Sequence, residues 1–210
     1  MEIATHNLAN LNRSLVPTIG QLAPDFSLPS IQGKTIQLKD FIGNKKVVLW
    51  FSRGFTCPYC RGFMESVVTG YDKLKEKDIE IVQISPNLHQ SAVKFFGDTP
   101  PPFPMVCDPD KRLFSTYAIG DAGAFRATTN MVVSFAVSAQ KGEFLKTARA
   151  SSMDVLDRQF LKRLHHHALT ALNQAVITID INGYIRNRVD VDALEDIPST
   201  SRMIQLFEKG

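Results

Sequence analysis

Two cysteines three positions apart are the residues of this chain best suited to do chemistry. They stand in the run Cys57-Pro58-Tyr59-Cys60, and a third cysteine, Cys107, lies far from them. Two thiols at this spacing can close a small, strained and reversible disulfide, or they can supply half of a metal site. No second CxxC and no CxxH follows in the sequence. The spacing therefore favours redox chemistry over a metal site, with a pair of inert buried thiols as the third interpretation.

The elements around the pair decide how reactive the thiols are. The run from Lys46 to Ser52 is apolar at every position from Val47 to Phe51 and predicts a central strand that is buried on both faces. After the cysteines, apolar residues recur at three- and four-residue steps and predict a helix that ends near Lys77; they are Phe63, Met64, Val67, Val68, Tyr71 and Leu74. The start of a helix stabilises a thiolate through its unpaired N–H groups and its dipole. We therefore expect Cys57 to be the more exposed sulfur, with a lowered pKa, and to be the nucleophile.

Several neighbours are expected to support the two thiols. Arg53 and Arg61 flank the pair, and their positive charge favours the thiolate. Pro58 suits the first turn of a helix, where its missing N–H costs nothing. Thr56 directly precedes the pair and is counted with the supporting residues. Cys107 ends an apolar strand, so we interpret it as a buried structural cysteine.

The remaining pattern is that of an α/β protein. A βαβ unit with a further αβ step follows from the alternation of apolar strands and helices after the cysteines. Asn182-Gly183 predicts a tight hairpin turn between two strands near the end of the chain. The predicted elements are an edge hairpin from Gly20–Leu28 and Lys34–Leu38, strands at 80–85, 103–107, 175–181 and 184–189, short helices ending near Gly97 and at Tyr117, and a last helix at 199–209.

We expect one domain over residues 1–210, with residues 1–16 as an N-terminal arm. Residues 121–173 are not needed by this core and are predicted to be an inserted, mostly helical segment. Its second part has a capping box at Ser151 and Asp154 followed by helical periodicity. The part from Met131 to Ala148 is ambiguous between strand and helix, and helix is favoured.

Composition excludes some classes of function. The chain has 24 basic and 21 acidic residues, a formal net charge of +3, which is too small an excess to predict a nucleic-acid partner. The sequence contains no run of about 18 apolar residues, so no membrane span is predicted. The first residues lack the pattern of a signal peptide. A cytoplasmic protein is the expectation, and in that reducing compartment a CxxC pair is redox-active or metal-binding more often than structural.

The motif and its surroundings resemble known families. Cys57-Pro58-Tyr59-Cys60 matches the active-site tetrad of glutaredoxins. The surrounding sequence resembles the AhpC/TSA family, the alkyl hydroperoxide reductase and thiol-specific antioxidant peroxiredoxins, and within it a peroxiredoxin-like subgroup with an inserted helical segment. The matching pieces cover most of the chain outside the insertion and are Gly20–Leu28, Val47–Phe51, Phe103–Asp110 and the hairpin Val176–Arg186.

The resemblance implies a thioredoxin-like fold, a central mixed sheet flanked by helices with a peroxiredoxin-type N-terminal extension. It implies an antioxidant enzyme of cell redox homeostasis, a thiol-disulfide oxidoreductase or thiol peroxidase. It further implies no bound cofactor and no metal, an external thiol reductant of the glutathione or thioredoxin type, and a small peroxide or disulfide substrate. A homodimer is compatible with it.

This chain departs from the peroxiredoxin pattern Pro-x-x-x-Thr-x-x-Cys. Alignment puts Cys60 in the peroxidatic position, Cys57 in the Thr position and Arg53 in the Pro position. Gln174 aligns with the second catalytic arginine, where thioredoxins have a cis-proline. These replacements favour dithiol exchange, in which Cys57 attacks and Cys60 resolves. In the peroxiredoxin alternative, Cys60 meets the peroxide and Cys57 resolves its sulfenic acid.

Two functions from other classes stay open at the level of sequence. The first is a metal or iron-sulfur protein that binds through the CxxC pair, as some glutaredoxin-like dimers do. The second is a non-catalytic redox sensor, in which oxidation of Cys57 and Cys60 moves the insertion and alters a partner surface.

Overall fold

The computed structural model describes residues 16–55, 57–120, 173–191 and 197–208, together with residues 136, 139, 140, 142 and 145. Most of the predicted N-terminal arm and most of the predicted insertion at 121–173 lie outside the described residues. Within the segment 131–148, Ala136, Ala139, Gln140 and Leu145 are helical. These four positions agree with the helical interpretation of that segment.

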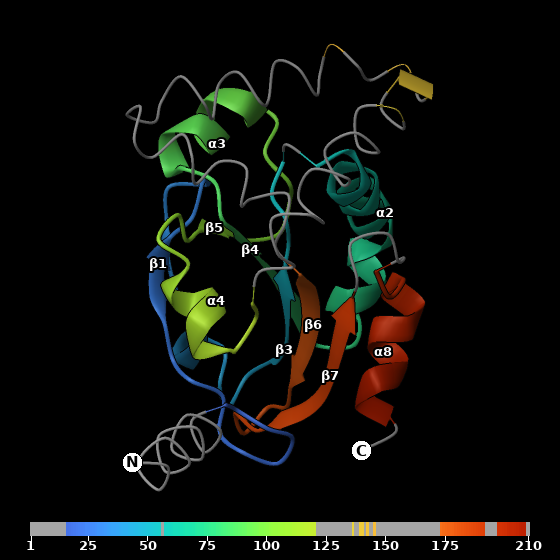
Figure 1. Cartoon of the computed structure of the whole chain (residues 1–210). Coiled ribbons are helices and arrows are strands. Elements are labelled where there is room, and N and C mark those ends of the chain that lie inside the picture. Colours follow the sequence, from blue (N-terminus) through green and yellow to red (C-terminus); the bar gives the residue numbers. More distant parts are fainter. Residues whose placement is uncertain are drawn as a thin grey trace, which may run out of the picture.

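A five-stranded mixed sheet forms the centre of the molecule (Figure 1), with the strand order β5-β4-β3-β6-β7. In that order the strands span Met105–Cys107, Ile79–Ser85, Lys46–Phe51, Gln174–Ile179 and Ile185–Val191. Strands β3, β4 and β5 run parallel, whereas β6 and β7 are antiparallel to their neighbours. The carboxyl ends of the parallel strands meet at one edge, where the chain leaves β3 toward the cysteines.

Each face of the sheet carries its own hydrophobic core. Val48 and Trp50 of β3 point into one core, and Val47, Leu49 and Phe51 point into the other. All five are fully buried, which is why the strand reads as one uninterrupted apolar run. The first core packs under α2 (Pro58–Lys75), α3 (His89–Phe96) and α8 (Thr200–Glu208). The second packs under α4 (Arg112–Thr116) and the N-terminal segment.

The N-terminal segment adds a two-stranded hairpin beside this core. β1 (Ser27–Pro29) pairs antiparallel with β2 (Thr35–Gln37), and the short 3-10 helix η1 (Leu38–Asp40) follows. The predicted edge hairpin is therefore confirmed, although both strands are shorter than predicted. An isolated bridge from Ser30 to Val106 attaches the hairpin to β5.

The predicted α/β order is confirmed, with corrections to the element ends. The third parallel strand begins at Met105 rather than Phe103. The turn predicted at Asn182-Gly183 is longer than two residues, since β6 ends at Ile179 and β7 begins at Ile185. The reason is Asp180, whose Oδ1 accepts hydrogen bonds from the N–H groups of both Asn182 and Tyr184 at 2.9 Å. Gly183 has φ +89°, as a tight turn there requires.

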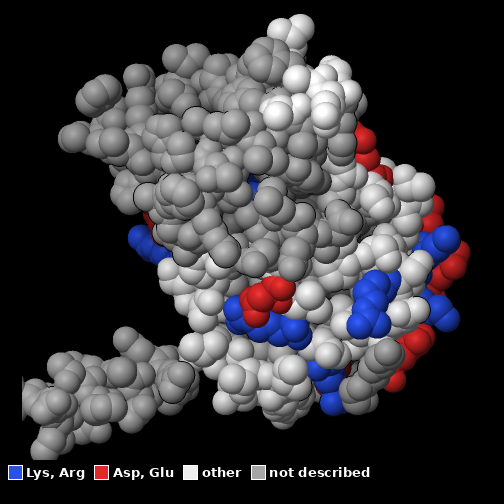
Figure 2. Space-filling model, turned by 45° about the vertical axis from the view of Figure 1, so that its right-hand side comes forward, with Lys and Arg blue, Asp and Glu red and all other residues white. Residues whose placement is uncertain are grey.

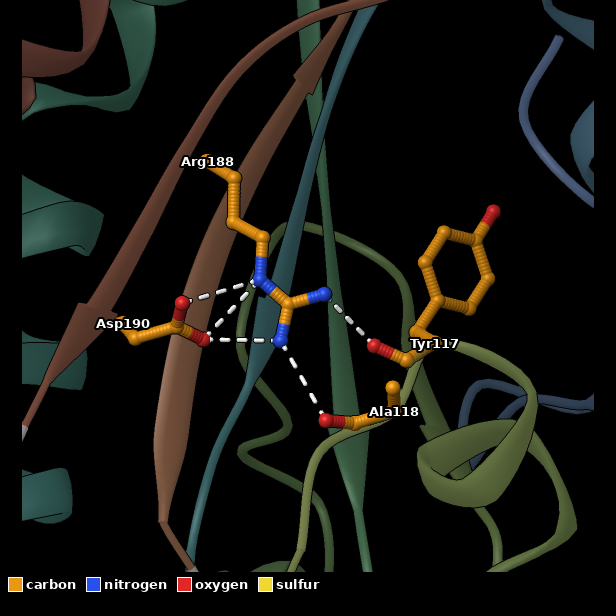
Figure 3. A network of polar contacts seen from close by, with 4 residues as sticks. All are labelled: Tyr117, Ala118, Arg188 and Asp190. Carbon is orange, nitrogen blue, oxygen red and sulfur yellow. Dashed lines mark hydrogen bonds and ion pairs between the residues drawn. The ribbon is translucent and has the colours of Figure 1, made fainter. Parts of the chain in front are cut away.

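Side chains of β7 hold the sheet to the segments at its margin. The Arg188 guanidinium donates to the carbonyl oxygens of Tyr117 and Ala118 at 2.6 and 3.4 Å and pairs with Asp190 at 2.8 Å (Figure 3). On the other side of the sheet, the Asn187 side chain donates to the carbonyl oxygen of Leu206 in α8. The last strand thus fastens both the end of α4 and the C-terminal helix.

The two ends of the predicted insertion lie together. The N–H of Asn173 donates to the carbonyl oxygen of Gly120 at 3.2 Å, just beyond the carbonyls that Arg188 holds. The described residues on either side of the predicted insertion are therefore hydrogen-bonded neighbours. The insertion at 121–173 and its helical content stay predictions.

On the face drawn in Figure 2, basic and acidic side chains are interspersed over the described surface without a broad area of one sign. That face offers no extended positive field for a nucleic-acid backbone. No helix among the described residues is both long enough and apolar enough to cross a bilayer.

The contact between α2 and α8 predicts the effect of a change at Gly70. A Cβ built on Gly70 would lie 2.6 Å from Oγ1 and 2.9 Å from both Cβ and Cγ2 of the buried Thr200. Gly70→Ala should improve helix propensity by about 1 kcal/mol, but overpacking costs of about 1–3 kcal/mol should exceed that gain. We expect urea denaturation to show a net loss of stability. The exposed neighbour Thr69→Ala is the control, and a stabilised Gly70→Ala protein would contradict this packing.

Candidate active site

The two cysteines lie at the start of α2, next to the carboxyl end of β3. Cys57 is the N-cap residue of the helix, with extended backbone angles, and Pro58 occupies its first turn as predicted. The N–H of Cys60 donates to the Cys57 sulfur at 3.5 Å. A side-chain acceptor at the N-cap position stabilises a helix start, and here that acceptor is a sulfur atom. The same contact and the helix dipole stabilise negative charge on Cys57.

Both thiols are buried. Cys57 is 3% exposed and Cys60 is fully buried, and neither forms a disulfide. Cys57 is thus the slightly more exposed of the two sulfurs, as expected, but both thiols lie within the core. The reason is packing, because Cys57 and Cys60 both belong to the core under α2, together with Met64 and Trp50.

The environment of Cys60 favours its protonated thiol over the thiolate. Its Sγ donates a hydrogen bond to Oε1 of Gln174 at 3.2 Å. Burial raises the pKa of the Cys60 thiol well above its usual value, and the hydrogen bond and charge of Cys57 raise it further. The positive charge and backbone N–H of Arg53 act in the opposite direction. The two sulfurs of the pair are thus held in unlike surroundings.

Arg53 and Arg61 lie at the site in different roles. Arg53 is buried beside Cys60, where its charge and backbone N–H favour the Cys60 thiolate. Arg61 is also buried, but its Nη1 donates to the carbonyl oxygen of Phe55 at 2.9 Å. This guanidinium therefore holds the loop before the cysteines. Thr56 lies outside the described residues.

A buried polar network shapes the loop from β3 to α2. The Ser52 hydroxyl accepts from the N–H of Gly54 at 3.2 Å and from Nε2 of Gln83 at 3.0 Å. Oδ1 of Asn87 accepts from the N–H of Phe55 at 3.1 Å and from the Ser85 hydroxyl at 2.7 Å. The sequence did not predict the four side chains of this network as site residues; they are Ser52, Gln83, Ser85 and Asn87. The one available signal was the presence of polar residues where two central strands end.

A largely apolar cavity of about 620 Å³ lies one helical turn along α2 from the cysteines. Its walls are Arg61, Met64, Glu65 and Val68 of α2, Phe95 and Phe96 of α3, the segment 99–102 and Leu145. Phe55 of the active-site loop stacks on Phe95 with ring centroids 4.7 Å apart. The cavity therefore shares Arg61 and an aromatic contact with the loop that carries the cysteines.

Cys107 is buried in the same core at the end of β5, as its structural interpretation expects. Among the described residues, no three His, Cys, Asp or Glu side chains gather in a way that could hold a metal ion.

Comparison with known proteins places this arrangement in a family. The model of the AhpC/TSA family matches residues 19–141, more than half of the chain. The chain belongs to the AhpC/TSA family. The match spans β1 to α4, including both cysteines and the polar loop network.

Individual relatives of this AhpC/TSA protein carry two kinds of name. A Helicobacter pylori protein provisionally named peroxiredoxin bcp is 34% identical over 99 residues, which are 47% of this chain and 64% of the relative. ResA of Bacillus thuringiensis, named a thiol-disulfide oxidoreductase, is 36% identical over 103 residues, 49% of this chain and 58% of its own length. The chain thus spans somewhat under two thirds of the curated relatives it matches. Both names denote thiol-dependent redox proteins.

Among solved structures, reduced 2-Cys peroxiredoxin of Plasmodium vivax superposes with a TM-score of 0.61 at 14% identity, covering 91% of this chain and 81% of that one. This likeness confirms the predicted thioredoxin-like fold, with its mixed sheet and flanking helices. The resemblance to the AhpC/TSA family is confirmed as well.

The loop before the cysteines predicts that this AhpC/TSA protein needs glycine at position 54. Gly54 has φ +86°, and a Cβ there would lie 1.9 Å from Oδ1 of Asn87. Gly54→Ala should therefore break the contact between Asn87 and Phe55 and displace the start of α2. We expect a loss of stability of more than about 2 kcal/mol and slower thiol reaction, because clash adds to strain.

Gly33→Ala is the matched control. Gly33 has φ +83° but nothing within 4 Å of an added Cβ, so it carries the backbone strain alone, about 1–2 kcal/mol. Equal losses in denaturant unfolding for the two variants would show that Asn87 does not constrain the loop.

Proposed function

We propose that this AhpC/TSA protein is a thiol-dependent reductase that cycles between a Cys57/Cys60 dithiol and a Cys57–Cys60 disulfide. The observation that carries the proposal is the unlike treatment of the two sulfurs. Cys57 accepts an N–H at a helix start, which favours a thiolate, whereas Cys60 donates to Gln174 from full burial, which favours a thiol. Cys57 is accordingly the attacking sulfur, and Cys60 is the resolving one.

With a disulfide substrate, the Cys57 thiolate attacks one sulfur, forms a mixed disulfide and releases the other half as a thiolate. Cys60 then attacks the Cys57 sulfur, closes the intramolecular disulfide and releases the second half, which takes up the Cys60 proton. The substrate is reduced by two electrons and the protein is oxidised by two. An external thiol of the glutathione or thioredoxin type returns the protein to the dithiol.

With a peroxide substrate, the Cys57 thiolate breaks the O–O bond and becomes a sulfenic acid, while the leaving alkoxide or hydroxide takes a proton. Cys60 condenses with the sulfenic acid and releases water. Both routes end in the same Cys57–Cys60 disulfide, so the oxidised protein alone does not distinguish them.

We infer that an organic disulfide is the better oxidant. The peroxiredoxin pattern has a proline, a threonine and an arginine where this chain has Arg53, Cys57 and Gln174. This chain therefore lacks groups with which peroxiredoxins activate a peroxide. The cavity along α2 has mainly apolar walls and could take an organic substituent, which hydrogen peroxide does not have. The name of the ResA relative supports thiol-disulfide chemistry, and the name of the bcp relative supports peroxide reduction as the alternative.

The remaining expectations belong to this proposal. The protein acts as a single domain with an insertion at 121–173, without a bound cofactor, and in the cytoplasm. The apposition of Gly120 and Asn173 supports the insertion. A bound cofactor is not needed for the proposed cycle, because the two cysteine sulfurs carry both electrons themselves.

Stopped-flow mixing of the reduced protein with glutathione disulfide, an organic hydroperoxide and hydrogen peroxide tests the proposal. We expect glutathione disulfide to oxidise the protein fastest. Cys57→Ser should abolish the reaction, while Cys60→Ser should keep the first step and accumulate a glutathione mixed disulfide on Cys57, visible by mass spectrometry.

Cys107→Ser is the matched control and should react as the natural sequence does. If hydrogen peroxide or the hydroperoxide reacted fastest, the peroxiredoxin alternative would replace the disulfide substrate. A Cys57→Ser protein that still reacts would reverse the roles of the two cysteines.

A further inference from the structure

Gln174 lies next to Cys60, although 114 positions separate the two residues in the chain. It is the first residue of β6 and pairs with Val191 of β7, one residue beyond the pairing of Ala175 with Phe51 of β3. Its side chain is 1% exposed, and its Oε1 is the acceptor for the Cys60 thiol at 3.2 Å. The backbone of Gln174 is thus fixed by the sheet, while its amide is directed at a reacting sulfur.

The other half of the amide is not satisfied in the reduced state. Nε2 of Gln174 is buried and has no hydrogen-bond partner among the described residues. A buried amide N–H without a partner destabilises the folded protein, so its retention beside two sulfurs points to a use in another state of the site. A primary amide presents an acceptor and a donor from one position, and a half-turn about its last torsion exchanges them.

The sulfur that faces this amide changes its hydrogen-bonding needs during the cycle. As a thiol, Cys60 donates, and Oε1 matches it. As a thiolate, Cys60 has no proton and needs donors. Arg53 beside it supplies positive charge and a backbone N–H, whereas Cys57 opposes ionisation of Cys60 through a side-chain hydrogen bond and through its own negative charge. Once Cys57 is in a mixed disulfide that opposing charge is gone.

We propose that Gln174 is a positioning residue for the resolving step, whose Oε1 accepts from the Cys60 thiol at rest and whose Nε2, after rotation of the amide, donates to the Cys60 thiolate during attack. The inference rests on the proposed function, since it takes Cys60 as the resolving sulfur. In that step the Cys60–Cys57 bond forms, the bond from Cys57 to the substrate sulfur breaks, and the Cys60 proton passes to the leaving thiolate.

Reaction with 5,5'-dithiobis(2-nitrobenzoate) separates this step from the first one. Attack by Cys57 releases one coloured thionitrobenzoate, and attack by Cys60 on the mixed disulfide releases the second. Gln174→Glu should leave the first phase within about twofold of the natural sequence and slow the second at least tenfold, because a carboxylate accepts from the thiol but repels the thiolate. Gln174→Leu, which can neither accept nor donate, should slow the second phase to an intermediate degree.

A second readout follows the Cys60 sulfur alone. In a Cys57→Ser/Cys107→Ser background, which leaves Cys60 as the one thiol, ultraviolet thiolate absorbance should titrate at higher pH with Gln174→Glu than with Gln174, because the added negative charge disfavours the Cys60 thiolate. If Gln174 served packing alone, Gln174→Glu would leave this titration unchanged. The second phase would then not be slower in Gln174→Glu than in Gln174→Leu.

Thr178→Val is the matched control, since Thr178 is a buried residue on the same face of β6, four positions along the strand. It should change neither phase. A normal first phase in each variant shows that the start of α2 is folded. Second phases within twofold of each other for Gln, Glu and Leu at position 174 would overturn the proposal. Loss of the first phase in Cys60→Ser but not in Cys57→Ser would instead overturn the assignment of the two sulfurs.

Discussion

The start of α2 is the constraint on which the site depends. Cys57 caps the helix through its sulfur, which accepts from the N–H of Cys60. That contact requires the chain to turn sharply between the end of β3 and Pro58. The turn is possible because Gly54 adopts a positive φ and because Asn87, from the loop after the neighbouring strand β4, accepts from the N–H of Phe55. The sheet therefore sets the position of the cysteines through polar groups at its carboxyl edge.

The start of α2 also makes the two cysteine side chains chemically unequal. Three residues apart, Cys57 receives a hydrogen bond and Cys60 gives one. The difference arises from their positions, since Cys57 precedes the helix while Cys60 faces the core and β6. A helix start and a buried amide thus divide the roles of attacker and resolver without a metal or a cofactor in the proposed cycle. The same reasoning explains how Gln174 can act on one sulfur and not on the other.

The sequence was informative where the pattern is local. The apolar run of β3, the stripe along α2 and Pro58 in the first turn follow from periodicity and helix-start chemistry. The structure agrees with them, except that Val68 of the predicted stripe is exposed. Longer-range relations could not be derived in this way. The contacts of Asn87 with Phe55 and of Gln83 with Ser52 join residues about thirty positions apart, and no periodicity marks them. The burial of Cys57 was missed because a helix-start position indicates charge stabilisation and says nothing about what packs above it.

Alignment and geometry contributed differently at Gln174. The resemblance aligns Gln174 with a catalytic arginine of the family, so alignment alone indicates only that the arginine side chain is missing. The structure shows it as the hydrogen-bond partner of Cys60, 114 positions away in the chain. Where the resemblance implies an arginine, this chain has a neutral side chain that can both accept and donate. That property suits the proposed cycle, in which the resolving sulfur is held as a thiol until it is needed.

The central claim is that Cys57 is the sulfur that ionises and attacks. Alkylation of the reduced natural protein with substoichiometric iodoacetamide over a range of pH, followed by peptide mass spectrometry, tests it most directly because both thiols compete in one molecule. The account predicts that Cys57 is modified in preference to Cys60 at neutral pH and that this preference narrows as the pH rises. Preferential modification of Cys60 at neutral pH would contradict the account.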